Sequence, residues 1–167
     1  NLLASDLVGL FNATDIYSCL GLYHDEDFGM APAEAMSCGA LAILSDWGGF
    51  SSFADKSGHC QLVPVRIGEQ GLEFSRTAFL DSIILQTEKS QDNSSRDERS
   101  LEFQNRFALD AGAQKLKSIH AEKCEPFHGF SWILNQYADR VGHSTLYPDG
   151  PKRGTLYEEI YGNYISE

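Results

Sequence analysis

Two short apolar runs, separated by helix-forming residues, constrain the fold of this chain more than any other feature. The first run, residues 16–22, mixes β-branched, aromatic and aliphatic side chains, and the second covers residues 40–44. Between them, Pro32 suits the first turn of a helix and Gly39 suits its end. Parallel strands need a crossover of this kind, so the pattern predicts an α/β fold with a parallel sheet flanked by helices.

The loop between the first strand and the helix is the predicted binding region, because such loops lie at the carboxyl ends of parallel strands. A helix that begins near residues 29–32 presents free N–H groups that favour an anion, typically a phosphate. Gly29 lets a ligand approach the backbone closely. Glu34, in the first helical turn, can accept hydrogen bonds from a vicinal diol, and Glu26 can reach the same pocket from the loop. An anion site beside two carboxylates suits a ligand with both phosphate and sugar hydroxyls.

The segment that follows Asp25 carries a recognisable motif. It reads Glu-Asp-Phe-Gly-Met-Ala-Pro-Ala-Glu-Ala-Met-Ser-Cys-Gly over residues 26–39. This resembles the Glu-x7-Glu motif of retaining glycosyltransferases in family 4, which have the two-domain GT-B fold. Residues 10–15, the glycine loop that ends segment 41–49, and Phe-Ser-Trp at 130–132 are also similar to segments of that family.

The resemblance implies a domain organisation. Residues 1–143 would form a Rossmann-like, donor-binding part of the C-terminal domain of a GT-B fold, and residues 144–167 a tail with a final helix. The family's first strand-helix units, which carry the basic residues for the donor diphosphate, and its N-terminal acceptor domain would precede residue 1. The first residue is Asn, so we expect a part of a longer enzyme that transfers no sugar by itself.

The resemblance also implies residue roles. Glu26 would be the catalytic residue that faces the donor sugar, and Glu34 would bind the ribose hydroxyls of a nucleotide-sugar donor. Backbone N–H groups of Phe28, Gly29 and Met30 would contact the sugar or phosphate of the donor. Further residues would line the same cleft: His24, Asp46, Trp47, Gly48 and Gly49.

Each role has a structural alternative. Glu34 would complement the helix dipole, Glu26 would be a solvated loop acid, Phe28 would enter the core below a tight turn, and His24 and Trp47 would be ordinary loop and packing residues. The Asp-x-Asp sequence at 25–27 also matches a pattern with which a different glycosyltransferase fold holds a divalent metal. The loop and helix context favours the metal-independent GT-B pattern. We therefore expect no metal and no cofactor, with the nucleotide-diphosphate sugar as substrate.

The amino-acid composition limits the classes of partner that this chain can bind. The formal charge of −11 argues against a nucleic-acid partner, because phosphate contacts need clustered Lys and Arg. No apolar run approaches the roughly 20 residues that span a bilayer. The four cysteines lack Cys-x-x-Cys spacing, which favours free thiols in a reducing compartment.

We expect a nucleotide-sugar donor, a glycan, lipid or protein acceptor, contact with the N-terminal domain of the same protein, and a location in the cytoplasm or at the cytoplasmic face of a membrane.

Two other functions stay open: a non-catalytic nucleotide- or sugar-binding module with the same fold, and an interaction module whose last helix, near residues 156–165, docks on another domain. The remaining pattern predicts less specific elements. These are a helix over 5–13 capped by Ser5 or Asp6, a strand over 61–67, a loop over 68–75, a helix near 76–88 with Phe79, Ile83 and Ile84 on one face, a solvated connector over 90–99, and helices over 100–121 and 131–141.

Overall fold

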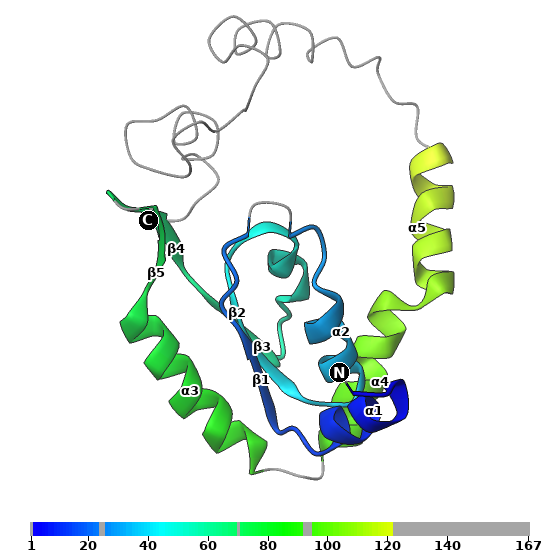
Figure 1. Cartoon of the computed structure of the whole chain (residues 1–167). Helices are drawn as coiled ribbons and strands as arrows, with labels where there is room; N and C mark the ends of the chain where they lie inside the picture. Colours follow the sequence, from blue (N-terminus) through cyan, green and yellow to red (C-terminus); the bar gives the residue numbers. More distant parts are fainter. Residues whose placement is uncertain (1, 24–25, 70, 92–94, 122–167) are drawn as a thin grey trace, which may run out of the picture.

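A three-stranded parallel sheet organises the part of the chain that the computed structural model describes, namely residues 2–23, 26–69, 71–91 and 95–121 (Figure 1). Its strands lie in the order β1 (Ile16–Cys19), β2 (Leu41–Ser45), β3 (Cys60–Val63). Both neighbouring pairs are parallel. The expected α/β, Rossmann-like sheet flanked by helices is confirmed.

Helices cover both faces of this sheet (Figure 1). The crossover helix α2 (Met30–Ser37) and the 3-10 helix η1 (Gly48–Phe53) lie on one face, with α4 (Arg96–Phe107) packed behind α2. Helix α3 (Arg76–Ser90) covers the other face. Helices α1 (Ala4–Asn12) and α5 (Leu109–Ala121) complete the described helices.

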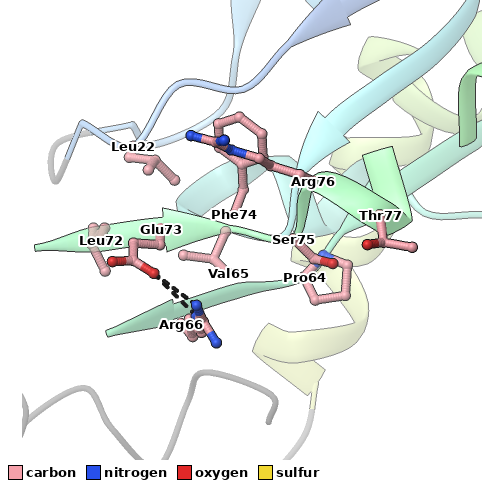
Figure 2. Close-up of a pocket in the computed structure, with 10 residues that line it drawn as sticks. All are labelled: Leu22, Pro64, Val65, Arg66, Leu72, Glu73, Phe74, Ser75, Arg76 and Thr77. Atoms are coloured by element: carbon pink, nitrogen blue, oxygen red, sulfur yellow. Dashed lines mark hydrogen bonds and ion pairs between the residues drawn. The ribbon is translucent and has the colours of Figure 1, made fainter. Parts of the chain in front are cut away.

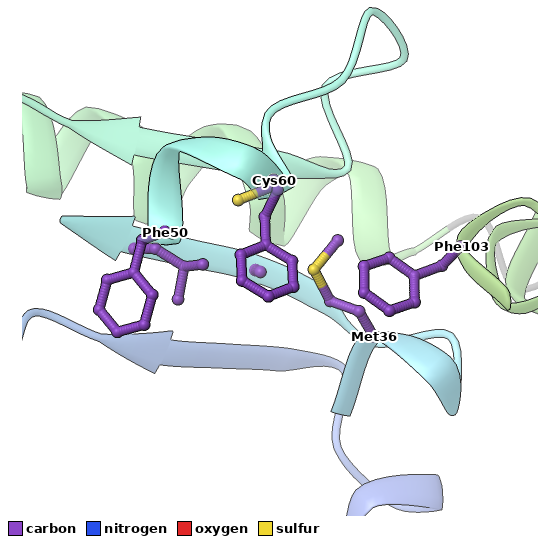
Figure 3. Close-up of a cluster of buried hydrophobic side chains, with 7 residues drawn as sticks. Met36, Phe50, Cys60 and Phe103 are labelled. Atoms are coloured by element: carbon purple, nitrogen blue, oxygen red, sulfur yellow. The ribbon is translucent and has the colours of Figure 1, made fainter. Parts of the chain in front are cut away.

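The hydrophobic core is built around the central strand β2. All five residues of β2 are buried, as the continuous apolar run of a central parallel strand requires. Ala42 and Leu44 face a cluster built from α2, η1, β3 and α4 (Figure 3). In that cluster the rings of Phe53 and Phe103 stack with centroids 5.8 Å apart.

The predicted strand over residues 61–67 divides at Pro64. Strand β3 ends before it, and β4 (Val65–Ile67) leaves the sheet to pair antiparallel with β5 (Leu72–Phe74). Pro64 has no N–H to continue a ladder, and its carbonyl instead accepts a hydrogen bond from the N–H of Ser75 at 2.9 Å. The prediction of a loop over 68–75 is therefore wrong at residues 72–74.

The buried face of α3 differs from the predicted one. Of the three predicted residues, Phe79 is half-buried and packs on Phe74, but Ile83 and Ile84 are exposed, whereas Ser82 and Gln86 are buried. The Nε2 of Gln86 donates to the carbonyl of Gly58 at 3.1 Å and lies 3.4 Å from that of Ala42, so this polar side chain ties the helix to the sheet. A prediction of the buried face from apolar spacing alone does not include such hydrogen bonds, and it misses Ser82 and Gln86 here.

Three further expectations about this part of the fold are wrong. Helix α1 has Leu3 at its N-cap and no side-chain cap, so neither Ser5 nor Asp6 caps it. The connector predicted over 90–99 is helical from Arg96 onward, because buried Arg99 donates from its Nε to the carbonyl of Gly39 at 3.0 Å. The helix predicted over 100–121 is interrupted at Ala108, whose backbone is extended.

Several predictions lie outside the described residues: the segment 130–132, the helix over 131–141, the boundary between 143 and 144, and the final helix near 156–165. Within the described ranges, no helix is both long enough and apolar enough to cross a bilayer.

Candidate functional site

The loops that follow β1 and β2 meet at the carboxyl edge of the sheet. The N–H of Gly49 donates to the carbonyl of Glu26 at 2.7 Å. A Cβ added to Gly48 would lie 2.4 Å from that same carbonyl oxygen, and one added to Gly49 would lie 2.0 Å from the oxygen of Asp27. The structure thus brings the predicted glycine loop and the predicted binding loop together, and the space beside both glycines is taken by the backbone of residues 26–28.

Helix α2 begins without a side-chain cap. Its N-cap is Gly29, in the left-handed region with φ of 91°, and a Cβ there would lie 2.6 Å from the ring of Phe50. The carbonyl of Gly29 accepts the N–H of Ala33, and Pro32 has no N–H to satisfy. The N–H groups of Met30 and Ala31 have no partner within the helix, so they are free to meet an anion or solvent.

The two predicted carboxylates both lie within electrostatic reach of the Tyr17 hydroxyl. Burial is the main cause that raises the pKa of the Tyr17 hydroxyl, and the charges of Cys19, Glu26 and Glu34 raise it further. Both carboxylates therefore lie close enough to one phenol to affect its proton. Glu34 is exposed on α2 and Glu26 is half-buried in the loop, so both can be reached from solvent.

The rings of Phe28 and Trp47 are engaged in packing, as the structural alternatives require. The ring of Phe28 lies 5.1 Å from that of Phe53 and 5.6 Å from that of Phe107, between centroids. Trp47 is buried, and its Nε1 donates to the carbonyl of Tyr23 at 3.0 Å. Neither ring is left to stack on a ligand.

The other predicted residues lie around this centre. Met30 is exposed at the first position of α2, and Asp46 is half-buried, with its N–H bonded to the carbonyl of Val63 at 2.8 Å. His24 and Asp25 lie outside the described residues, so the Asp-x-Asp alternative is described only at exposed Asp27. Across the described ranges, no three His, Cys, Asp or Glu side chains are grouped to hold a metal ion.

The charge of the site is negative. Among the ion pairs of the described residues, none joins a Lys or Arg to Glu26, Asp27 or Glu34. Nearby arginines are engaged elsewhere: Arg106, for example, donates to the carbonyls of Phe53 and Ala54. The described residues therefore supply a helix start and two carboxylates that are not neutralised by a Lys or Arg partner.

A cavity next to this site was missed by the sequence prediction. It has a volume of about 860 Å³ and lies between Leu22, the β4–β5 hairpin and the start of α3 (Figure 2). The prediction of a structureless loop over 68–75 hid it. The available signal was an apolar–polar–apolar pattern on each side of a glycine-containing turn. Val65 and Ile67 are the apolar residues before the turn, and Leu72 and Phe74 are those after it.

Comparison of the chain with protein-family models, curated proteins and solved structures finds no match. A function for the chain therefore rests on its own residues. Those residues supply an uncapped helix start after β1 and two solvent-accessible carboxylates, one in the loop and one on the helix.

Proposed function

We propose that this chain is the donor-binding portion of a retaining glycosyltransferase, within the C-terminal domain of a GT-B fold. The observation that carries the proposal is the uncapped start of α2 at Gly29, with Glu34 exposed one turn further on and Glu26 in the loop that is bonded to Gly49. The similarity of the segment 26–39 to the family's Glu-x7-Glu motif supports the same assignment.

The proposed roles follow from position. Backbone N–H groups at the start of α2, from Gly29 and Met30 onward, would hold a phosphate oxygen of the donor with help from the helix dipole. Glu34, one turn into the helix, would accept hydrogen bonds from the ribose hydroxyls. Glu26 would face the donor sugar. Stabilisation of the departing diphosphate would be electrostatic and would need cations from residues beyond those described here.

The same proposal specifies the acceptor, the location and the partners of the reaction. A sugar would pass with retained anomeric configuration from the nucleotide to a glycan, lipid or protein acceptor held by another domain, in the cytoplasm or at the cytoplasmic face of a membrane. We expect no metal or cofactor and no nucleic-acid partner. Because the described residues pair no Lys or Arg with the site carboxylates, and the proposed enzyme needs a separate acceptor domain, we expect no sugar transfer by these 167 residues alone.

Calorimetric titration of the full 167-residue chain with UDP, GDP and ADP tests the proposal. We expect one of the three to bind at a single site, and Glu34→Ala to weaken it by about 1–3 kcal/mol through lost charged hydrogen bonds. Glu98→Ala is the matched control, because Glu98 is an exposed carboxylate in the first turn of α4. The absence of nucleotide binding, or an equal loss in both variants, would overturn the proposal.

A non-catalytic nucleotide- or sugar-binding module is the second candidate, and the missing Lys or Arg partner at the described carboxylates favours it. Release of nucleoside diphosphate from a nucleotide-sugar by the full-length protein separates the two. The transferase predicts release that Glu26→Ala and Glu34→Ala abolish, whereas the module predicts binding without release. An interaction module predicts neither.

A further inference from the structure

The cavity beside the candidate site has three walls. Leu22, from the segment after β1, forms one, the β4–β5 hairpin forms the second, and Ser75 to Thr77 at the start of α3 form the third (Figure 2). Its volume of about 860 Å³ lies within the range of small-molecule sites, which is about 300–1,000 Å³.

The inner surface of the cavity is apolar and incompletely covered. Leu22, Leu72 and Phe74 are only half-buried, although they pack on the buried pair Trp47 and Val65. Their open sides face the cavity, which they line. A ligand with an aromatic or aliphatic body would remove this apolar surface from water and gain stabilisation in proportion to the area covered.

The rim of the cavity is positively charged, in a chain with a formal charge of −11. Arg66 is neutralised by Glu73, whose Oε2 lies 2.9 Å from its Nη2. Arg76 forms no ion pair or hydrogen bond with any side chain that the structure describes, and it extends from the start of α3 toward the Leu22 side of the cavity (Figure 2). One net positive charge therefore remains among the lining residues.

The start of α3 adds donors to this charge. Ser75 caps the helix by accepting the N–H of Ala78 on its Oγ at 3.2 Å, and its carbonyl accepts the N–H of Phe79 at 3.0 Å. The N–H groups of Arg76 and Thr77 are not used by this cap, so they are available to an acceptor in the cavity. The cationic side chain and the two N–H groups lie beside the apolar wall, on the same cavity.

We propose that this cavity binds a small amphipathic anion, with an apolar ring or chain against Leu22, Leu72 and Phe74 and a phosphate or carboxylate head at Arg76. The site is separate from the proposed donor site, because neither Glu26 nor Glu34 lines it. The proposal goes beyond nucleotide-sugar binding and does not depend on it.

Titration of the full chain with 1-naphthyl phosphate, followed by amide NMR shifts, tests the proposal. We expect saturable binding at one site, with shifts centred on residues 72–77. 1-Naphthol, which lacks the anion, and inorganic phosphate, which lacks the ring, should each bind at least about tenfold more weakly, because each keeps only one of the two interactions. Equal binding by 1-naphthol or by inorganic phosphate would overturn the proposal, as would the absence of saturable binding.

Two variants and two controls locate the probe. Arg76→Gln should weaken 1-naphthyl phosphate by about fivefold or more while leaving 1-naphthol unchanged, because it removes only the charged hydrogen bonds. Leu72→Ser should weaken both naphthyl compounds, with circular dichroism confirming that the variant is folded. Lys115→Gln, on exposed α5, should change neither. Glu34→Ala should also change neither, and weakening by that variant would place the probe at the donor site and contradict the proposal.

Discussion

Gly29 is the residue on which the start of α2 depends. Its φ of 91° lies in the left-handed region, and a Cβ there would meet both the ring of Phe50 at 2.6 Å and Pro32 Cγ at 2.9 Å. The role expected from the sequence was close approach of a ligand to the backbone. The structure adds a packing reason, because the ring of a buried core phenylalanine occupies the side where a Cβ would project.

Gly29→Ala should lower the free energy of unfolding by about 1–3 kcal/mol, because alanine is strained at this φ and its methyl group displaces Phe50. Urea denaturation measures the change. Gly9→Ala is the control, since Gly9 lies in α1 with no atom within 4 Å of the place its new methyl group would take, and it should stabilise by about 0.5–1 kcal/mol. A neutral Gly29→Ala would contradict the described backbone.

His59 should make stability depend on pH. Its Nδ1 lies 3.5 Å from a carboxylate oxygen of Asp55 and 3.6 Å from one of Glu102, yet burial outweighs their attraction and lowers the pKa of His59 below 6.5, with Lys89 and Arg99 acting in the same direction as burial. The unfolded chain then binds the proton more readily. This contribution to stability is complete above pH 6.5 and is lost as the pH falls through the folded-state pKa.

Denaturation of the wild-type chain and of His59→Gln at about pH 7.5 and about pH 5.5 checks this sign. We expect the wild type to lose more stability than the variant on acidification. An equal loss in the two proteins would show that other groups carry the pH dependence.

At the scale of elements, α3 is held to the sheet by a polar side chain. Gln86 is completely buried and its Nε2 donates to backbone carbonyls of the sheet and of the turn before β3, whereas Ile84 is exposed. Gln86→Ala should therefore destabilise the fold by about 1–3 kcal/mol, while Ile84→Gln should change it by less than about 0.5 kcal/mol. Thermal and urea unfolding compare the two variants. A larger loss of stability in Ile84→Gln than in Gln86→Ala would show that the packed face of α3 is the one predicted from the apolar spacing.

The central strand-helix-strand unit was predictable because local signals agree there. The apolar run of β2, the proline in the first turn of α2 and Gly39 after its end mark elements of the expected type. The meeting of the two loops was also predictable in outline, because parallel strands end at one edge. The tight contact of Gly49 with the backbone of Asp27 was not, since it depends on tertiary distance.

Most of the errors arise at residues whose structural role an apolar pattern does not register. Arg99 is buried against the carbonyl of Gly39, so a charged segment that reads as a connector becomes helix α4. Pro64 ends a run of strand-forming residues and redirects the chain into a hairpin. The break at Ala108 has no glycine or proline beside it, so nothing in the sequence marked it.

For the whole molecule, stability should be concentrated around β2. All five β2 residues are buried and both neighbouring strands pair with it, whereas most side chains of α5 are exposed, including Leu109 and Leu116. In native-state hydrogen exchange we expect the amides of Leu41–Ser45 to be the slowest of the described residues and those of α5 among the fastest. Exchange of α5 amides as slow as that of β2 would contradict this distribution.

The segment between Gly21 and Tyr23 is fixed to the end of β2 at two points. Ser45 Oγ donates to the carbonyl of Gly21 at 2.6 Å, and Trp47 donates to that of Tyr23. Leu22, which lines the cavity, lies between these tethers, and Glu26 follows a few residues later. A molecule that moved the backbone at Leu22 would strain these tethers, so its affinity would be linked to the position of the donor loop. Linkage of this kind is reciprocal: if a ligand in the cavity changes the affinity for the donor by some factor, the donor changes the affinity for that ligand by the same factor.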